Sequence, residues 1–328
     1  MIRIIGTGSY LPEKILTNKD IEKFVNTTDE WITQRTGIKE RRIAREDEAT
    51  SDLAYNASIK ALEMAQLKPE DLELIILGTS TPDYQIPACA PIIQHRLGCK
   101  RIPAFDINSV CTSFTFAFLT AYSYIASGLY NNCLLIGADV YSKILNWKDR
   151  NSCVIFGDGG GAFVIKKDTT KKGIMSHVFG VEGSGAHQIR IPVGGSRNPL
   201  HSIEDFNKYD PKDIYFQMEG KKVYEFTLSV ITGITKTLIE KSGLTKEEID
   251  FFVFHQANIR IIDMISRVLN IPMEKFLVNI DKVGNTSSAS IPIVVDEAVR
   301  SGKIKDGDKI LMLGFGGGLS WGGVVFEW

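Results

Sequence analysis

A segment that ends at residue 78 recurs in the second half of the chain, and this repeat limits the folds that the sequence can adopt. QLKPEDLELIILG (66–78) aligns with GLTKEEIDFFVFH (243–255) at an offset of about 177 residues. Each segment is typical of a helix end, a polar turn and a buried strand. The same offset places Cys111 on Ser288 and aligns LLIGA with LMLGF. Although βαβ units in general resemble one another, three matches at one offset predict two halves of similar build.

Short apolar runs alternate with segments of helical length, which is typical of α/β layering with largely buried strands. The strand-like runs span residues 72–78, 102–108 and 132–138, and the helical segments span residues 51–66 and 111–128. We predict two halves, residues 1–170 and 171–328, joined by the polar segment KKDTTKKG (166–173). Residues 184–220 are rich in Gly and Pro without periodicity, and such segments usually cover a site or an interface.

The composition favours a cytoplasmic protein without a nucleic-acid or membrane partner. Lys and Arg number 38 against 39 Asp and Glu, so no global charge favours nucleic acid or an anionic membrane. No apolar run approaches the roughly 20 residues that span a bilayer, and the N-terminus lacks the long apolar region of a signal peptide. The five cysteines form no C-x-x-C pair, so we expect free thiols in a reducing cytoplasm.

Cys111 follows a short apolar run and a polar loop, and it opens a long apolar helical segment in FDINSVCTSFTFAF. Backbone N–H groups and the dipole at a helix start favour a thiolate, so this position lowers the cost of forming a nucleophile. Most free cysteines are small buried residues, which is the alternative for Cys111 when its local sequence is taken alone. The other four fit that description: Cys89, Cys99, Cys133 and Cys153.

Two further segments supply polar side chains that could meet Cys111. His255 ends a buried strand in DFFVFHQANIRII, at the edge of the sheet where α/β proteins bind ligands. Asn285 lies in the turn VGNTSSASIP and presents a side-chain amide. By the repeat, this turn takes the place in the second half that the Cys111 loop takes in the first. We therefore expect the three residues to converge, although each alone is equally typical of a structural histidine or an ordinary turn.

Glycine-rich segments favour an oxyanion hole over a nucleotide site. LGFGGGLSWGG (313–323) offers backbone N–H groups without side chains in the way, as an oxyanion hole needs. GTGSYL (6–11) and GFGGGL (314–319) lack the third glycine of the dinucleotide fingerprint. GDGGGA (157–162) has suitable spacing, but a strand-like segment follows it where the fingerprint requires a helix. We expect no nucleotide cofactor at these loops.

Six segments match, in order and in spacing, those of a known family. They are TDEWITQRTGIKERR (28–42), FDINSVCTSF (105–114), KDRNSCVIFGDGGGA (148–162), HQANIRI (255–261), GNTSSASIP (284–292) and GFGGGLSWG (314–322). With them the chain resembles the β-ketoacyl-[acyl-carrier-protein] synthase III enzymes over essentially its whole length. The resemblance implies a thiolase-like five-layered αβαβα fold, a homodimer, and a catalytic triad of Cys111, His255 and Asn285. It implies no metal and no cofactor, with a coenzyme A thioester as substrate.

The resemblance also implies the residues around the triad. The N–H groups of Cys111 and Gly317 would form the oxyanion hole. The coenzyme A and pantetheine contacts would be Trp31, Arg35, Arg150 and Asn258, and an indole between guanidinium groups can stack on adenine and pair with phosphate. The stretch that would bind acyl carrier protein comprises Gln256, Ala257, Asn258, Ile259 and Arg260. The acyl pocket would include Ile86 and Phe315.

Four positions depart from the family pattern. Ser113 stands where Gly is usual, and Ile86 stands where some members place a bulky aromatic against the acyl chain. Glu225 replaces a Lys or Arg that is usual near the acyl-carrier surface, and Val268 replaces a common basic residue. The last two changes predict a weaker positive patch for docking acyl carrier protein, and the change at Ile86 favours a different or roomier acyl pocket.

We therefore predict an acyltransferase that initiates fatty-acid biosynthesis by a ping-pong cycle. Cys111 would take the acyl group from an acyl-CoA primer, and a decarboxylating Claisen condensation would join it to malonyl-acyl carrier protein. The alternative within this fold is an acyltransferase or condensing enzyme of secondary metabolism that uses malonyl-CoA or a non-carrier acceptor. The alternative outside it is a non-catalytic acyl-CoA-binding or scaffold protein, which the presence of all three triad residue types disfavours. The sequence does not give the chain length of the primer.

Overall fold

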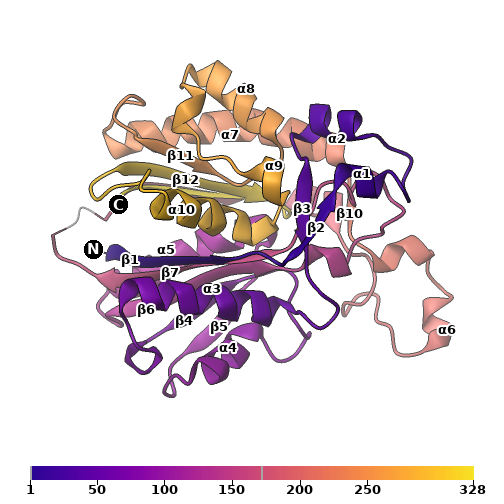
Figure 1. Cartoon of the computed structure of the whole chain (residues 1–328), viewed down its shortest axis with the longest axis horizontal. Helices are drawn as coiled ribbons and strands as arrows, with labels where there is room; N and C mark the ends of the chain where they lie inside the picture. Colours follow the sequence, from indigo (N-terminus) through magenta and orange to yellow (C-terminus); the bar gives the residue numbers. More distant parts are fainter. Residues whose placement is uncertain (1, 171–172) are drawn as a thin grey trace.

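Two β-sheets organise the computed structural model, which describes residues 2–170 and 173–328 (Figure 1). In order across the first sheet, the strands are β1 (Ile2–Tyr10), β7 (Gly159–Lys167), β6 (Asn132–Asp139), β4 (Ile75–Gly78) and β5 (Ala104–Ile107). Across the second, they are β11 (Phe251–Phe254), β12 (Lys309–Gly316), β13 (Ser320–Glu327) and β8 (Ile174–Val181). Parallel pairs form one side of the first sheet, where β4 lies between the edge strand β5 and β6.

Helices form three layers around the two sheets (Figure 1). The outer face of the first sheet carries α3 (Thr50–Ala65) and α4 (Cys89–Leu97), and the outer face of the second carries α7 (Gly220–Ser242) and α8 (Ile259–Leu269). Between the sheets lie α5 (Ser113–Ala126) and α10 (Ser290–Arg300). The order of layers is therefore α, β, α, β, α, and the predicted five-layered fold is confirmed.

Elements that lie one repeat apart agree in kind, and two of them also agree in bounds. The short 3-10 helices η2 (Val110–Thr112) and η7 (Ser287–Ala289) occupy equivalent positions, and each leads directly into a central helix. Val110 and Ser287 both have a φ of 51°, so the two turns share an unusual backbone conformation. The predicted duplication is therefore confirmed for these elements. The boundary at residue 170 stays a prediction, because part of the connector 166–173 lies outside the described residues.

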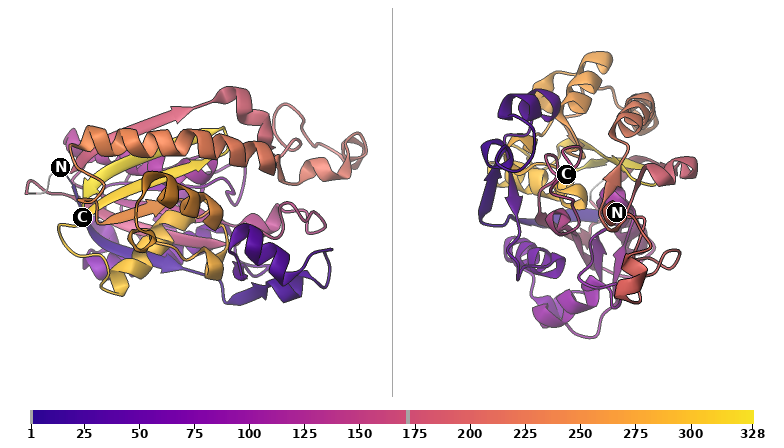
Figure 2. Two further views of the ribbon diagram at one scale, coloured as in Figure 1. Left: turned by 90° about the horizontal axis from the view of Figure 1, so that it is seen from above. Right: turned by 90° about the vertical axis from the view of Figure 1, so that its right-hand side faces the viewer.

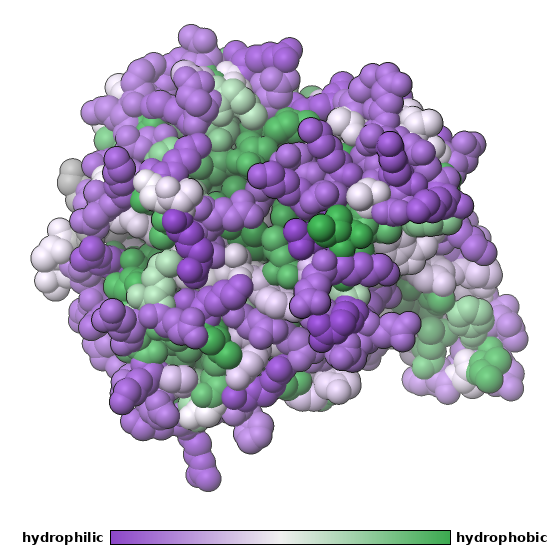
Figure 3. Space-filling view, in the orientation of Figure 1, coloured by the Kyte–Doolittle hydropathy of each residue, from purple (hydrophilic) through white to green (hydrophobic). Residues whose placement is uncertain are grey.

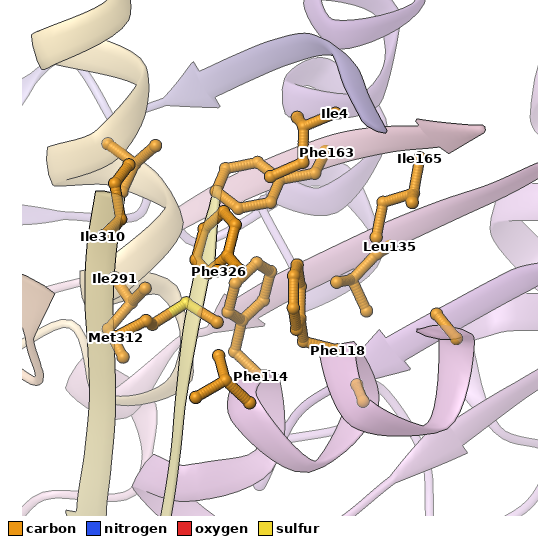
Figure 4. Close-up of a cluster of buried hydrophobic side chains, with 14 of the residues drawn as sticks. Ile4, Phe114, Phe118, Leu135, Phe163, Ile165, Ile291, Ile310, Met312 and Phe326 are labelled. Carbon is orange, nitrogen blue, oxygen red and sulfur yellow. The ribbon is translucent and has the colours of Figure 1, made fainter. Parts of the chain in front are cut away.

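The central helices are buried because both sheets pack against them. Figure 4 shows Phe114 and Phe118 of α5 among side chains from β1, β6, β7, β12 and β13. The ring of Phe114 meets that of Phe163 edge-on, with centroids 5.1 Å apart. Complete burial of one such side chain contributes about 1.5–3 kcal/mol. This core explains why residues 111–128 are apolar nearly all round, and it holds both central helices, with the turns before them, in fixed positions.

The predicted elements are present, and two of the strands, β4 and β5, are shorter than the apolar runs. β4 begins at Ile75 rather than residue 72, and α5 begins at Ser113, so Cys111 lies in the turn before this helix. Residues 184–220 form an irregular excursion at one end of the molecule, which Figure 2 shows projecting from the layers. It contains only brief elements: η4 (Gly183–Gln188), β9 (Ile189–Arg190), α6 (Ile203–Phe206), η5 (Pro211–Ile214) and β10 (Gln217–Met218).

The remaining elements lie at the edges of the layers. They are β2 (Lys14–Thr17), α1 (Asn18–Ile21), α2 (Asp29–Thr36), β3 (Glu40–Ile43), η1 (Pro69–Asp71), η3 (Tyr141–Lys143), η6 (Met273–Lys275) and α9 (Ile280–Val283). The face in Figure 3 is largely hydrophilic, with apolar areas at its centre and over the segment that contains α6. Within residues 2–170 and 173–328, no helix is long and apolar enough to cross a membrane.

Candidate active site

A cavity of about 700 Å³ brings Cys111, His255 and Asn285 together, although they lie far apart in the sequence. Cys111 comes from η2, His255 follows the end of β11, and Asn285 lies in the turn between α9 and η7. Both sheets therefore contribute to one site, and the predicted convergence of the three residues is confirmed. The cavity continues outward to Trp31, Arg35 and other residues near the surface.

Cys111 is packed tightly at the inner end of this cavity. It is 8% exposed, and Gly316 at the end of β12 lies directly against it. A Cβ on Gly316 would come within 2.7 Å of Cys111 Cβ and 3.2 Å of Sγ. Real carbon contacts of this kind begin near about 3.5 Å, so only glycine allows the strand to approach the thiol so closely.

The net effect of this position on the thiol is opposite to our expectation. Burial raises the pKa of Cys111 to about 12, and the Asp139 carboxylate raises it further. Hydrogen bonds from the Ser287 hydroxyl and from backbone N–H groups, those of Cys111 and Gly317, lower it, but by less. These two N–H groups are the ones predicted for the oxyanion hole, and that role stays a prediction. The prediction of an easily formed thiolate was wrong for the free protein, because desolvation outweighs these donors.

A contact at Nδ1 fixes the imidazole of His255, and burial keeps the ring neutral. Ser290 Oγ lies 2.7 Å from Nδ1, and it also accepts a hydrogen bond from the N–H of Gln256 at 3.4 Å. Burial lowers the pKa of His255 to about 3, which a hydrogen bond to the backbone of Ser287 only partly offsets. The ring also packs edge-on against Phe315, with centroids 5.3 Å apart. A neutral, fixed imidazole therefore faces this site.

Asn285 is fixed through its backbone and through one side of its amide. Its N–H donates to Ile155 O at 3.0 Å, and its carbonyl accepts from the N–H of Gly157 at 3.0 Å. Oδ1 accepts from the N–H of Ser287 at 2.8 Å. Because Oδ1 is occupied, the Nδ2 group is the donor that Asn285 can offer to a ligand in the cavity.

In the outer part of the cavity, two guanidinium groups lie over one indole ring. Arg35 and Arg150 both lie over the ring of Trp31, each with Cζ 4.8 Å from its centroid. Asn258 caps α8 by accepting from the N–H of Arg260, and its Nδ2 donates to the Arg35 carbonyl at 2.9 Å. The four predicted coenzyme A residues are thus brought together, and all four line the cavity.

The predicted carrier-protein stretch divides into buried and accessible parts. Gln256 is completely buried, and its Nε2 donates to the carbonyls of Phe254 and Leu277. It therefore cannot belong to an exposed docking surface, which corrects the prediction for this residue. Ala257, Asn258 and Ile259 are partly exposed and Arg260 is exposed, so they remain candidates.

The two positions that depart from the basic family pattern lie on the surface. Glu225 on α7 is exposed and lies 3.9 Å from Lys221 one turn earlier. Val268 on α8 is 56% exposed. Neither position supplies a positive charge, so the surface lacks cations at both positions, as predicted.

The two predicted acyl-pocket residues lie in different places. Phe315 is 3% exposed and lines the cavity beside His255. Ile86 is 88% exposed and does not line the cavity. Within one chain, the structure therefore does not bring Ile86 to the predicted pocket, because the loop that carries it lies on the outer surface.

Three hydroxyl residues of the site were not predicted. Ser287 contacts the thiol, Ser290 contacts the imidazole, and Tyr141 lines the cavity. Ser287 and Ser290 belong to the SSAS run just after Asn285, which could have indicated them. Tyr141 follows the end of β6, and the position of ligand sites at strand ends could have indicated it. Among the described residues, no group of His, Cys, Asp and Glu is suited to hold a metal ion.

Comparisons with known proteins agree with this geometry. Residues 105–183 match the family described as 3-oxoacyl-[acyl-carrier-protein (ACP)] synthase III, and residues 239–328 match its C-terminal part. The β-ketoacyl-[acyl-carrier-protein] synthase III of Caldanaerobacter subterraneus subsp. tengcongensis is 49% identical over 326 residues, covering 99% of this chain and 97% of the relative.

Solved structures give the same result. The crystal structure of 3-oxoacyl-[acyl-carrier-protein] synthase III from Aquifex aeolicus is 43% identical with a TM-score of 0.92, and the match covers 100% of both chains. A priming β-ketosynthase from a polyketide biosynthetic pathway is 32% identical with a TM-score of 0.91, covering 99% of this chain and 96% of that one. The chain belongs to the 3-oxoacyl-[acyl-carrier-protein] synthase III family.

Proposed function

We propose that the protein is a β-ketoacyl-acyl carrier protein synthase III that initiates fatty-acid biosynthesis. It condenses an acyl-CoA primer with malonyl-acyl carrier protein, and carbon dioxide and coenzyme A leave. One observation carries this proposal. Cys111, His255 and Asn285 meet at the inner part of a cavity whose outer part holds Trp31 with two arginines over its ring. Such a cavity suits a thioester whose acyl end reaches the thiol while its nucleotide end binds the indole and the guanidinium groups.

The first half of the cycle is acyl transfer to Cys111. Sγ attacks the thioester carbonyl, and the N–H groups of Cys111 and Gly317 stabilise the oxyanion. Both N–H groups lower the pKa of the Cys111 thiol in the free protein, which supports their role at the carbonyl that would replace it. Binding of the primer also supplies the energy that offsets the cost of ionising a buried thiol.

The second half is decarboxylation of the malonyl group and formation of the carbon–carbon bond. Negative charge appears on the malonyl thioester oxygen, and we assign the donors for it to His255 Nε2 and Asn285 Nδ2. Because Ser290 Oγ already accepts from Gln256, its own proton can donate to His255 Nδ1, which puts the imidazole proton on Nε2. Removal of one such donor typically costs about 100–1,000-fold in rate.

A homodimer and a cytoplasmic location belong to this proposal. Strand β5 forms an edge of the first sheet, and the nearby apolar side chains Tyr84 and Ile86 are 61% and 88% exposed. Unpaired edges and exposed apolar side chains are usually covered by a partner, so a second copy is the natural occupant. All five cysteines are free, which suits a reducing cytoplasm.

A condensing enzyme of secondary metabolism with a non-carrier acceptor is the second candidate. The exposed Glu225 and Val268 favour it, because they weaken the positive surface that an acidic carrier protein would meet. Comparison of malonyl-acyl carrier protein with malonyl-CoA as the second substrate separates the two candidates.

The nucleophile assignment is tested with radiolabelled acyl-CoA and the variant Cys111→Ala. We expect covalent label on the wild-type protein and none on the variant, since the other four thiols are remote from the cavity or deeply buried. Covalent label retained by Cys111→Ala would overturn the assignment.

A further inference from the structure

A row of buried hydroxyl groups links Cys111 to the carboxylate of Asp139. Ser287 Oγ donates to Cys111 Sγ at 3.4 Å, and the same hydroxyl lies close enough to Tyr141 to lower the pKa of its phenol. Tyr141 Oη lies 3.0 Å from Ser80 Oγ, which lies 3.1 Å from Asp139 Oδ1. Ser287, Tyr141 and Asp139 are at most 1% exposed, so little water competes for these groups. The proposed triad uses none of them.

The contacts of Asp139 determine which way the hydroxyl groups of this row donate their hydrogen bonds. Its Oδ1 atom lies within 3.1 Å of the hydroxyls of Thr79, Ser80 and Thr81 and of the N–H groups of Ser80 and Thr81. A carboxylate oxygen has about two lone pairs, so these donors exceed what Oδ1 can accept. Thr81 Oγ1 already accepts from the N–H of Val140, which keeps its own proton on Asp139. The hydroxyl proton of Ser80 is therefore free to turn toward Tyr141.

With Ser80 donating to Tyr141, the phenol proton can point to Ser287 Oγ, and the Ser287 proton can point to Cys111 Sγ. Each donor in such a chain polarises the next one and strengthens it. Tyr141 is fixed for this task, because its ring stacks on Phe156 with centroids 4.5 Å apart and meets Phe216 edge-on. The N–H of Ser287 is fixed in turn on Asn285 Oδ1.

The thiolate needs a donor of this kind during acyl transfer. Of the groups that lower the pKa of Cys111, two are the N–H groups of Cys111 and Gly317. In the proposed function these N–H groups bind the acyl oxygen. They therefore no longer stabilise the Cys111 sulfur once the thioester is bound. The Ser287 hydroxyl is the remaining side-chain donor at Sγ.

We propose that Ser287 is a further catalytic residue, whose hydroxyl donates a hydrogen bond to the Cys111 thiolate, and that Tyr141 and Ser80 are positioning residues that turn it toward the sulfur. In this step the Sγ–acyl bond forms and the acyl–sulfur bond of coenzyme A breaks. The thiol proton of Cys111 ends on the released coenzyme A, and Ser287 keeps its own proton. The inference deepens the proposed function and rests on it for the use of the two N–H groups.

The test is the rate at which iodoacetamide alkylates Cys111 at pH 8, with the adduct located by peptide mass spectrometry. Below the thiol pKa this rate follows the fraction of thiolate, so loss of one hydrogen bond to the charged sulfur should slow it about tenfold or more. We expect this decrease in Ser287→Ala and equally in Ser287→Gly, which suits the positive φ of this position.

Thr286→Val is the matched control. Thr286 is completely buried beside Ser287, and its Oγ1 has no hydrogen-bond partner among the described residues, so removing this hydroxyl should leave the alkylation rate unchanged. Tyr141→Phe should slow alkylation less than Ser287→Ala, and the double variant should react like Ser287→Ala alone, because Tyr141 acts through Ser287.

Wild-type alkylation rates in both Ser287 variants would overturn the inference, and a further decrease when Tyr141→Phe is added to Ser287→Ala would overturn the positioning role. Circular dichroism checks that each variant is folded. The assay contains no acyl-CoA, so its failure is distinct from a failure of the proposed function, which the radiolabelling of Cys111→Ala detects separately.

Discussion

Gly316→Ala should disable the nucleophile without removing any polar group. The added Cβ would lie 2.7 Å from Cys111 Cβ, 3.2 Å from Sγ and 3.3 Å from the Cys111 nitrogen. Carbon atoms pack at about 3.5–4.0 Å, so either the strand end or the thiol must move by roughly 1 Å. Cys111 has little room to move, because the α5 core fixes the turn that carries it.

A misplacement of about 1 Å at a reacting atom can cost about 100-fold in rate. Overpacking of this kind also destabilises a protein by about 1–3 kcal/mol, which a protein of this size survives. We therefore expect Gly316→Ala to fold, with acyl transfer slowed by about two orders of magnitude.

The assay is the burst of free coenzyme A on mixing with acyl-CoA, read together with the mass of the intact acyl-enzyme. Gly233→Ala is the control, since Gly233 lies on an exposed part of α7 and a Cβ there meets nothing within 4 Å. This variant should acylate normally and gain about 0.5–1 kcal/mol of stability. A folded Gly316→Ala protein with a wild-type burst would refute the close approach of β12 to the thiol.

Three further predictions concern the rest of the site. His255→Ala and Asn285→Ala should keep acyl transfer but slow malonyl decarboxylation about 100–1,000-fold. Release of labelled carbon dioxide measures the decarboxylation. Equal loss of both steps would contradict the division of roles. Because burial lowers the pKa of His255 to about 3, the imidazole stays neutral above about pH 5, so decarboxylation by preformed acyl-enzyme should be flat from about pH 5.5 to 8. A fall below about pH 6.5, where an ordinary histidine gains its proton, would refute this. Trp31→Ala should raise the KM for acyl-CoA about tenfold while leaving the KM for an acyl-pantetheine unchanged, and equal changes for both would disprove adenine stacking.

The sequence predicted the parts of the site that depend on where strands end and on which side chains are reactive or polar. His255 follows a buried strand, and the Cys111 and Asn285 turns are one repeat apart, so their convergence follows from the order of the elements. The arrangement of Arg35 and Arg150 over Trp31 was predicted only through the family resemblance. No local pattern joins residues so distant in the chain.

The sequence could not predict effects that depend on close packing. The pKa of the Cys111 thiol depends on how completely the surrounding residues bury it, and the sequence does not give that burial. Gln256 directly follows His255, yet it turns into the core to satisfy two backbone carbonyls. Buried hydroxyls such as Tyr141 and Ser287 follow no periodic pattern, because tertiary structure sets their partners.

Discharge of the acyl-enzyme tests the central claim most directly. The wild-type protein is first loaded with acyl-CoA and freed of excess primer, and then malonyl-acyl carrier protein or malonyl-CoA is added while the mass of the Cys111 peptide is followed. We predict that malonyl-acyl carrier protein removes the acyl group from Cys111 and yields 3-oxoacyl-acyl carrier protein with one carbon dioxide for each acyl group. An acyl-enzyme that is stable to malonyl-acyl carrier protein, or that only malonyl-CoA discharges, would contradict the account.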